Sequence, residues 1–433
     1  MTSVDYLDEV IRAQKRGQAC GVVSICSANS YVIEAALLHA QKVGSPVLIE
    51  STCNQVNQTG GYTGMTPARF VTYVDSIAEK LDYPRHRLLL GGDHLGPYPW
   101  RAEPAHFAMQ KSRDLVHDYV QAGYVKIHLD ASMRCADDDP DLPVSKFLAA
   151  KRAADLAEAA EDTYQQLSGT ETAPRYVIGT EVPLPGGAQG EDDQLTVTTV
   201  ADVQETIELT RIAFAETGLE AAWDRVVAVV VQPGVEFSDA AVHEYDRGRA
   251  VELSHFIERY PNLVYEAHST DYQTRRALKE MVEDHYAILK VGPALTFAFR
   301  EAVFALVMIE DELFPSKQRS NLIPVIDQVM LADPVHWQGY YRGDDAAKRF
   351  ARKFSFSDRI RYYWPDQRVQ RAFEILISNL IQKPPPLSTL SQYFPDQYEA
   401  IRSGSITGTP KDLVIARILA VLNDYHFATG DTK

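Results

Sequence analysis

The hydrophobic positions of the chain fall into short continuous runs that end in glycine or polar residues. Runs that are apolar at consecutive rather than alternate positions are typical of strands buried on both faces of a parallel sheet. Eight such runs occur in order: GVVSICSA from residue 21, SPVLIEST from 45, RLLLGGDHLG from 87, YVKIHLDAS from 124, YVIGTEVP from 176, RVVAVVVQPG from 225, LVYEAHSTD from 263 and YAILKVGPA from 286.

Segments with helical periodicity separate these runs. SYVIEAALLHAQKVG and AHFAMQKSRDLVHDYVQAG, for example, repeat apolar residues three and four positions apart. Eight strands that are each followed by a helix favour an α/β fold of the (β/α)8 type, a TIM barrel, over an open doubly wound sheet. No GxGxxG motif opens the first strand–helix turn, which weakens a dinucleotide-binding interpretation. We expect the barrel to span residues 1–321.

The pattern changes after residue 321. FSFSDRIRYYWPDQRVQRAFEILISNL is aromatic and basic before it becomes helical, and the proline run of QKPPPLSTLSQYFPDQY interrupts any helix. We therefore predict that residues 322–433 form a helical C-terminal extension that packs on the barrel.

Composition narrows the choice of partners. The 433 residues carry a net charge of −16, so neither nucleic acid nor an anionic membrane surface is an expected general partner. The N-terminal segment has no apolar core of signal-peptide length, and no apolar run reaches the roughly 18 residues that span a membrane. Four scattered cysteines without CxxC spacing fit a reducing cytoplasm. The sequence leaves self-association open.

Polar and ionisable residues stand where the predicted strands end. Burying such groups unpaired costs roughly 2–7 kcal/mol each, so their gathering at one rim predicts a site there. The alternative is a barrel interior that tolerates a few satisfied polar side chains. The strand-end residues are Glu50, Asn54, Asp93, His94, Lys126, His128, Asp130, Glu181, Gln232, Glu236, Glu266, His268, Ser269, Asp271 and Lys290.

Two histidines and a carboxylate in this set suit a divalent metal. His94, His268 and Glu181 would supply mixed nitrogen and oxygen ligands to Zn²⁺, Mn²⁺, Co²⁺ or Ni²⁺. Asp93, beside His94, is the predicted general acid/base, with helix capping as its alternative role. Glu181 and Asp271 are further catalytic carboxylate candidates.

A substrate would meet other side chains at the same rim. Glu50, Asn54 and Ser269 are predicted to bind it, and Lys290 to make a charge contact rather than a Schiff base. For a phosphate, SFSDRIRYYW offers Arg359 together with its neighbour Arg361, because arginine binds phosphate in a bidentate manner. The alternative is that both are surface arginines of a helix.

Several longer motifs closely resemble the GatZ/KbaZ family, the Z-type proteins of tagatose-1,6-bisphosphate aldolase systems. They extend over nearly the whole chain: STCNQVNQTGGYTGMTP, GGDHLGP, KIHLDASM, IGTEVPLPGGA, QPGVEF, EAHSTDYQ, LKVGPALTFAFREA and SDRIRYYWP. The resemblance implies a TIM barrel related to class II, metal-dependent aldolases, with Asp93 as acid/base and His94 and His268 as ligands. Class II aldolases also place a histidine at the end of strand six. This sequence has Gln232 there, so we expect Gln232 or Glu236 to substitute.

The resemblance leaves the function divided. Some members of this family are described as accessory subunits of an aldolase Y subunit, others as D-tagatose 6-phosphate 4-epimerases, and an older label is tagatose 6-phosphate kinase. The sequence has no GxxxxGK[ST] motif, which disfavours a kinase. The C4 proton of a ketose phosphate is not acidic, so inversion at C4 is best explained by metal-assisted cleavage and re-formation of the C3–C4 bond. We therefore predict a cytoplasmic epimerase of tagatose and galactitol catabolism that converts this phosphorylated ketohexose to D-fructose 6-phosphate. The alternatives are a non-catalytic Z subunit and, third, an aldolase that acts alone.

Overall fold

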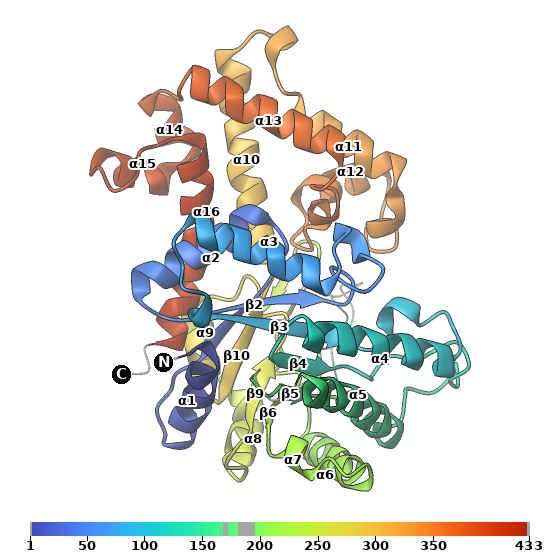
Figure 1. Cartoon of the computed structure of the whole chain (residues 1–433). Coiled ribbons are helices and arrows are strands. Elements are labelled where there is room, and N and C mark those ends of the chain that lie inside the picture. Colours follow the sequence, from blue (N-terminus) through green and yellow to red (C-terminus); the bar gives the residue numbers. More distant parts are fainter. Residues whose placement is uncertain (1, 168–171, 181–194, 431–433) are drawn as a thin grey trace.

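Eight parallel strands close into a barrel in the computed structural model, which describes residues 2–167, 172–180 and 195–430 (Figure 1). Each predicted apolar run forms one of these strands, so the TIM-barrel prediction is confirmed. In order around the barrel the strands are β1 (Val22–Cys26), β2 (Val47–Thr52), β3 (Leu88–Leu95), β4 (Lys126–Leu129), β5 (Arg175–Ile178), β6 (Val226–Val230), β9 (Val264–Ala267) and β10 (Tyr286–Val291). A short antiparallel hairpin that the sequence did not predict, β7 (Glu236–Phe237) and β8 (Val242–His243), follows β6.

Helices follow the strands and surround the barrel, because each has an apolar stripe to bury against the sheet. They are α2 (Ser30–Val43), α3 (Pro67–Lys80), α4 (Ala105–Gln121), α5 (Lys146–Gln166), α6 (Val200–Glu216), α7 (Glu220–Trp223), α8 (Arg247–Ile257), α9 (Arg275–Glu283) and α10 (Pro293–Leu313). Many begin at a side-chain cap: the Asn29 carboxamide oxygen, for instance, accepts the first free N–H groups of α2.

The N-terminal helix α1 (Ser3–Lys15) closes the barrel at the amino ends of its strands. Its buried Leu7 and Val10 join a cluster with inward-facing strand residues such as Leu48, Leu89 and Val227. Fully burying an aliphatic side chain of this size contributes roughly 1.5–3 kcal/mol. One end of the barrel is thus filled with hydrocarbon, and polar chemistry is confined to the other end.

The C-terminal segment is helical, as predicted. It contains α11 (Leu322–Ala332), α12 (Asp345–Phe354), the 3-10 turn η6 (Arg359–Tyr362), α13 (Gln367–Gln382), α14 (Leu387–Tyr393), α15 (Pro395–Arg402) and α16 (Pro410–Thr429). Most of it extends away from the barrel, but α16 returns and packs along α9, α2 and α10 (Figure 1). There the Thr429 carbonyl accepts the Gly21 N–H at 2.9 Å, and the Tyr425 hydroxyl lies 2.9 Å from the Thr270 hydroxyl. The last helix is therefore part of the wall around the barrel.

Among the described residues, no helix combines the length and the hydropathy needed to cross a bilayer.

Candidate active site

A layer of charged side chains crosses the interior of the barrel. Nζ of Lys126, on β4, lies 2.6 Å from Oε1 of Glu50 on β2 and 2.7 Å from Oε2 of Glu266 on β9. The strand between β2 and β4 contributes Gly91, and a Cβ atom there would come within 2.7 Å of Oε1 of Glu50. Glycine at this position leaves the space through which Glu50 reaches Lys126.

Lys290, on β10, extends this layer toward the mouth of the barrel. Its ammonium contacts Glu50 and lies 2.9 Å from Oδ1 of Asp93 and 3.7 Å from Oε1 of Glu266. Burial lowers the pKa of Lys290, but the surrounding negative charges, led by Asp93, outweigh burial and hold the pKa well above its usual range. The ion pairs of Lys290 with Glu50 and Asp93 fit a charge contact better than a Schiff base. Glu50, predicted to bind substrate, is instead fully buried against both lysines.

Asp93 and His94 both face the interior, although neighbouring residues of a strand normally point to opposite faces. The register between β3 and β4 shifts between Gly92 and Leu95, and His94 adopts a left-handed backbone with φ of 50°. Such an irregularity turns a side chain that regular pleating would direct outward. It explains how the Asp-His pair can act at one site.

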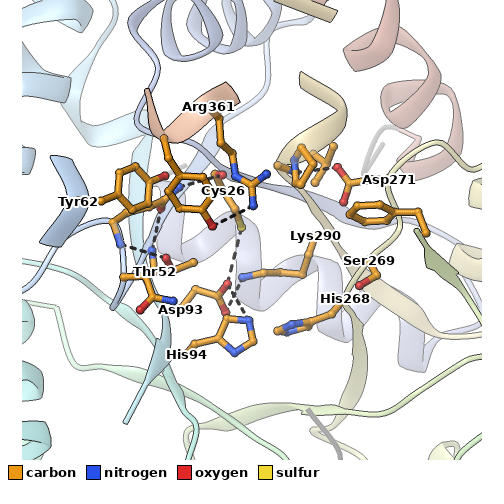
Figure 2. A pocket seen from close by; sticks show the side chains of 17 residues that line it. Cys26, Thr52, Tyr62, Asp93, His94, His268, Ser269, Asp271, Lys290 and Arg361 are labelled. Carbon is orange, nitrogen blue, oxygen red and sulfur yellow. Dashed lines mark hydrogen bonds and ion pairs between the residues drawn. The ribbon is translucent and has the colours of Figure 1, made fainter. Parts of the chain in front are cut away.

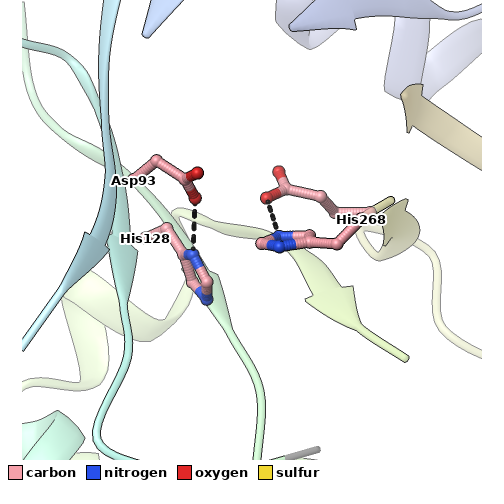
Figure 3. A group of neighbouring side chains, drawn as sticks. Asp93, His128 and His268 are labelled. Atoms are coloured by element: carbon pink, nitrogen blue, oxygen red, sulfur yellow. Dashed lines mark hydrogen bonds and ion pairs between the residues drawn. The ribbon is translucent and has the colours of Figure 1, made fainter. Parts of the chain in front are cut away.

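Three imidazoles meet beside Asp93. The ring centroids of His94, His128 and His268 lie 4.9 to 5.3 Å apart. Figure 3 shows Asp93, His128 and His268 pointing toward one another, with Nδ1 of His128 2.9 Å from Oδ1 of Asp93. One donor atom from each of Asp93, His128, Glu266 and His268 lies within 4.8 Å of all the others.

Two of the imidazoles have opposite pKa shifts. Nδ1 of His94 lies 2.9 Å from Oδ2 of Asp130, which orients the ring; burial lowers the pKa of His94, but Asp93 and Asp130 outweigh burial and raise it. Burial lowers the pKa of His268 to about 4, so its ring is neutral near pH 7. Nε2 of His128 is buried and has no partner among the described residues. Such an unsatisfied nitrogen is costly unless something binds it.

These residues fit a divalent cation. Glu50, Asp93 and Glu266 carry three negative charges against the two positive charges of Lys126 and Lys290, which leaves one negative charge for a cation. Neutral imidazole and carboxylate are the donor set that Zn²⁺, Mn²⁺, Co²⁺ and Ni²⁺ accept.

The predicted ligands are only partly brought together. His268 belongs to the group of four donors, and the His94 ring lies beside it at 4.9 Å. Gln232 is not among its neighbours: its Oε1 accepts the N–H groups of Gly234 and Val235 at 2.8 and 3.1 Å and shapes the turn after β6. Glu181 lies outside the described residues. His128, which the sequence analysis placed at a strand end without assigning it to the metal, supplies the third imidazole.

A pocket opens above this cluster at the mouth of the barrel (Figure 2). Of the predicted site residues, Asn54, Asp93, His94, His268, Ser269, Asp271 and Lys290 line it, whereas Glu50 and Arg359 do not. The complete lining is Cys26, Thr52, Asn54, Gln55, Tyr62, Asp93, His94, Phe237, His268, Ser269, Asp271, Lys290, Val291, Gly292, Pro293, Arg361 and Tyr362. The sequence analysis did not single out Cys26 or Tyr62, and it considered Arg361 only as the neighbour of Arg359.

The carboxylates Asp93 and Asp271 have opposite pKa shifts. For Asp93, burial raises the pKa, but His94 and Lys290 outweigh burial and hold the pKa well below its usual range. For Asp271, burial raises the pKa to about 6, although its Oδ1 accepts the N–H groups of Gly292 and Ala294. A carboxyl group with a pKa of about 6, such as that of Asp271, can accept and release a proton near neutral pH. Asp93, whose pKa is lowered, stays ionised and is suited to holding cations.

The predicted phosphate ligand Arg359 points away from the pocket. Its Nε donates to the His336 carbonyl at 2.6 Å, and its guanidinium lies 3.4 Å from the centre of the Tyr340 ring. Arg361 lines the pocket instead. Both belong to the 3-10 turn η6, where residues two positions apart leave the helix on different sides, so only one of them can face the mouth.

Fold and site together define a (β/α)8-barrel protein with an imidazole and carboxylate centre at the carboxyl ends of its strands, of the kind that holds a divalent metal. The chain belongs to the D-tagatose-1,6-bisphosphate aldolase subunit GatZ/KbaZ-like family, whose model matches residues 7–430. This confirms the resemblance seen in the motifs.

Solved structures extend the comparison. The chain is similar to a crystal structure from Sinorhizobium meliloti 1021 described as a probable tagatose 6 phosphate kinase, with 46% identity over 95% of this chain and 100% of that one and a TM-score of 0.87. A structure described as the YdjI aldolase from Escherichia coli K12 is 13% identical over 84% of this chain and 94% of that one, with a TM-score of 0.43. The second likeness is too weak to bear on function.

Proposed function

We propose that the protein is a metal-dependent D-tagatose 6-phosphate 4-epimerase that forms D-fructose 6-phosphate in tagatose and galactitol catabolism. The observation that carries the proposal is the cluster of Asp93, His128, Glu266 and His268, with donor atoms mutually within 4.8 Å at the floor of a polar pocket. Membership of the aldolase-related family supports it.

The chemistry starts from the poor acidity of the C4 proton, which lies two carbons from the carbonyl. Cleavage of the C3–C4 bond avoids this problem: the C4 hydroxyl loses its proton, and the bonding electrons move into an enediolate of carbons 1 to 3. The aldehyde fragment, carbons 4 to 6 with the phosphate, then turns its other face and the bond forms again. A divalent ion held here would act as a Lewis acid and stabilise the enediolate charge.

The residues of the chain divide this work. Asp271, whose pKa is raised to about 6, is the proposed base that takes the C4 hydroxyl proton and returns it after the aldehyde has turned. Asp93, His128, Glu266 and His268 would hold the ion, and the His94 ring lies beside them. Lys290 adds a positive charge in the same pocket, fixed by its ion pairs.

A second candidate function is that of a non-catalytic subunit that stabilises or activates a class II tagatose-1,6-bisphosphate aldolase. The observation in its favour is the family description, which names an aldolase subunit. Against it stands the unsatisfied, buried Nε2 of His128, since an inactive partner gains nothing from keeping such a group.

The test is turnover by the purified chain. Metal-free protein is supplied in turn with Zn²⁺, Mn²⁺, Co²⁺ or Ni²⁺ and with D-tagatose 6-phosphate, and D-fructose 6-phosphate is measured by a coupled assay. Conversion without ATP supports the epimerase and argues against a kinase. The His128→Gln variant is the matched control and should lose both metal and activity. No turnover with any of these metals would contradict the proposal, and a rise in the activity of an added aldolase Y subunit would support the second candidate.

A further inference from the structure

A second chamber adjoins the first pocket on the side of the C-terminal extension. The two share a wall of four side chains, namely Cys26, Gln55, Tyr62 and Arg361. The far side of the second chamber is polar, with hydroxyl or amide groups from Ser30, Thr63, Thr296 and Gln370, and is completed by Trp364. A molecule bound at the strand ends would therefore reach this chamber past Arg361.

Arg361 has N–H donors that its hydrogen bonds within the protein do not use. Both N–H groups of Nη1 are directed at the backbone carbonyls of Ser357 and Asp358, and Nη2 donates to the Tyr362 hydroxyl at 3.1 Å. Of the five N–H groups of a guanidinium, the Nε–H and one Nη2–H remain. In the part of the chain that the structure describes, neither has an acceptor, and no carboxylate forms an ion pair with Arg361.

This distinguishes Arg361 from the other cation of the pocket. Lys290 is neutralised by Glu50 and Asp93, whereas Arg361 is held by carbonyl and hydroxyl oxygens that leave its charge in place. Figure 2 shows Arg361 beside Tyr62, on the opposite side of the pocket from His94 and His268. In a chain of net charge −16, a guanidinium that forms no ion pair among the described residues and is fixed at the mouth of a pocket is the feature that an anionic ligand requires.

Trp364, which lines the second chamber, has an unsatisfied donor that is buried. Trp364 is 5% exposed, and its Nε1–H has no acceptor among the described residues. Trp364 and Arg361 both line this chamber, where Arg361 supplies the charged donors. The aromatic side chain of Tyr362, whose ring centre lies 4.6 Å from Cζ of Arg361, holds the guanidinium plane in position.

We propose that Arg361 is the phosphate-recognition residue of this site and that it places the phosphoryl end of a sugar phosphomonoester in the second chamber. The inference rests on the proposed function for the identity of the sugar. It means that the C-terminal extension, through η6, completes the substrate site of the barrel and selects phosphorylated over neutral ketoses.

Binding measurements on metal-free protein test this without any turnover. The probes are inorganic phosphate and D-fructose 6-phosphate, titrated by calorimetry into the wild type and the Arg361→Gln variant. We expect the variant to bind both at least about tenfold more weakly, because hydrogen bonds to a charged group are lost. Arg361→Lys should recover part of the loss. Arg349→Gln, an exposed arginine of α12, is the matched control and should bind both probes like the wild type.

Equal affinity of Arg361→Gln and wild type for D-fructose 6-phosphate would overturn the inference. If Arg361→Gln fails to fold, the Arg361→Lys variant decides, and phosphate affinity equal to wild type in that variant would overturn the inference as well. Arg361-dependent phosphate binding in a protein without epimerase activity would leave the inference standing and reject the proposed function. Epimerase activity of the wild type together with unchanged phosphate binding in Arg361→Gln would support the proposed function and reject the inference about Arg361.

Discussion

Replacing Lys126 by methionine removes the ammonium that joins two buried carboxylates in the centre of the barrel. Methionine keeps most of the side-chain volume, so packing changes little, whereas Glu50 and Glu266 each lose a partner at 2.6 and 2.7 Å. All three side chains are fully buried, so water cannot take the place of the lysine.

The magnitude follows from this burial. Removing one partner of a buried ion pair costs about 3–5 kcal/mol, because an uncompensated charge is left in a medium of low dielectric constant. An unfolding entropy of about 2.1 cal/mol/K per residue gives about 0.9 kcal/mol/K for the 433 residues. We therefore expect Lys126→Met to lower the Tm by about 3–6 °C.

Thermal unfolding followed by circular dichroism measures the change, and Lys146→Met is the matched control. Lys146 also faces two carboxylates, Asp202 and Glu205, but this group is partly exposed to solvent. Exposed ion pairs contribute about 0–1 kcal/mol, so the control should shift the Tm by about 1 °C or less. The double variant Lys126→Met/Glu266→Gln should recover part of the stability, because it removes one of the unpaired charges.

The sign of the pH dependence provides an internal check. Without Lys126, the buried carboxylates acquire raised pKa values in the folded state, so their protonated forms favour folding at low pH and their ionisation opposes folding at high pH. The stability difference between Lys126→Met and the wild type should therefore narrow as the pH falls from about 8 to about 5. A Tm shift as small as that of Lys146→Met, or a difference that widens on acidification, would refute the reasoning.

Two further predictions concern the metal and the proton. His128→Gln should lower the affinity for added Zn²⁺ or Co²⁺ by at least about 100-fold, which is more than the loss of a residue that only orients a ligand. Gln232→Ala should leave this affinity within a few fold of the wild type. Metal content is measured after equilibrium dialysis, and equal retention in both variants would contradict our ligand set. Turnover should fall as the pH drops below about 6, because protonated Asp271 cannot accept the C4 hydroxyl proton. Asp271→Asn should lose about 10²–10⁴-fold in kcat together with this acidic limb, and a variant that keeps the limb would assign it to another group.

The fold was readable from the sequence because its signals are local. A strand buried on both faces is apolar at most positions, and each of the eight apolar runs became a strand of the barrel. The position of Asp93 and His94 at the end of the third run was likewise predictable. That both side chains face the interior was not, because it depends on a register shift against β4 that strict alternation would not suggest.

The roles of several site residues depended on partners that are distant in sequence. Glu50 was predicted to meet substrate, but Lys290, 240 residues away in sequence, and Lys126 take up its charge inside the barrel. Arg359 and Arg361 are equivalent in the sequence, and only the direction of the η6 turn over the barrel mouth separates them.

The sequence by itself determined which segments are strands, where they end and which of them carry ionisable groups, because burial acts on each segment through its own hydrophobic pattern. Only the tertiary structure decided which of those groups meet. Closing the barrel fixes the register between strands, and that register brings His128 beside His94 and His268 while Gln232 is held in a turn. Electrostatic interactions depend on distances in space, and the order of residues along the chain does not contain those distances.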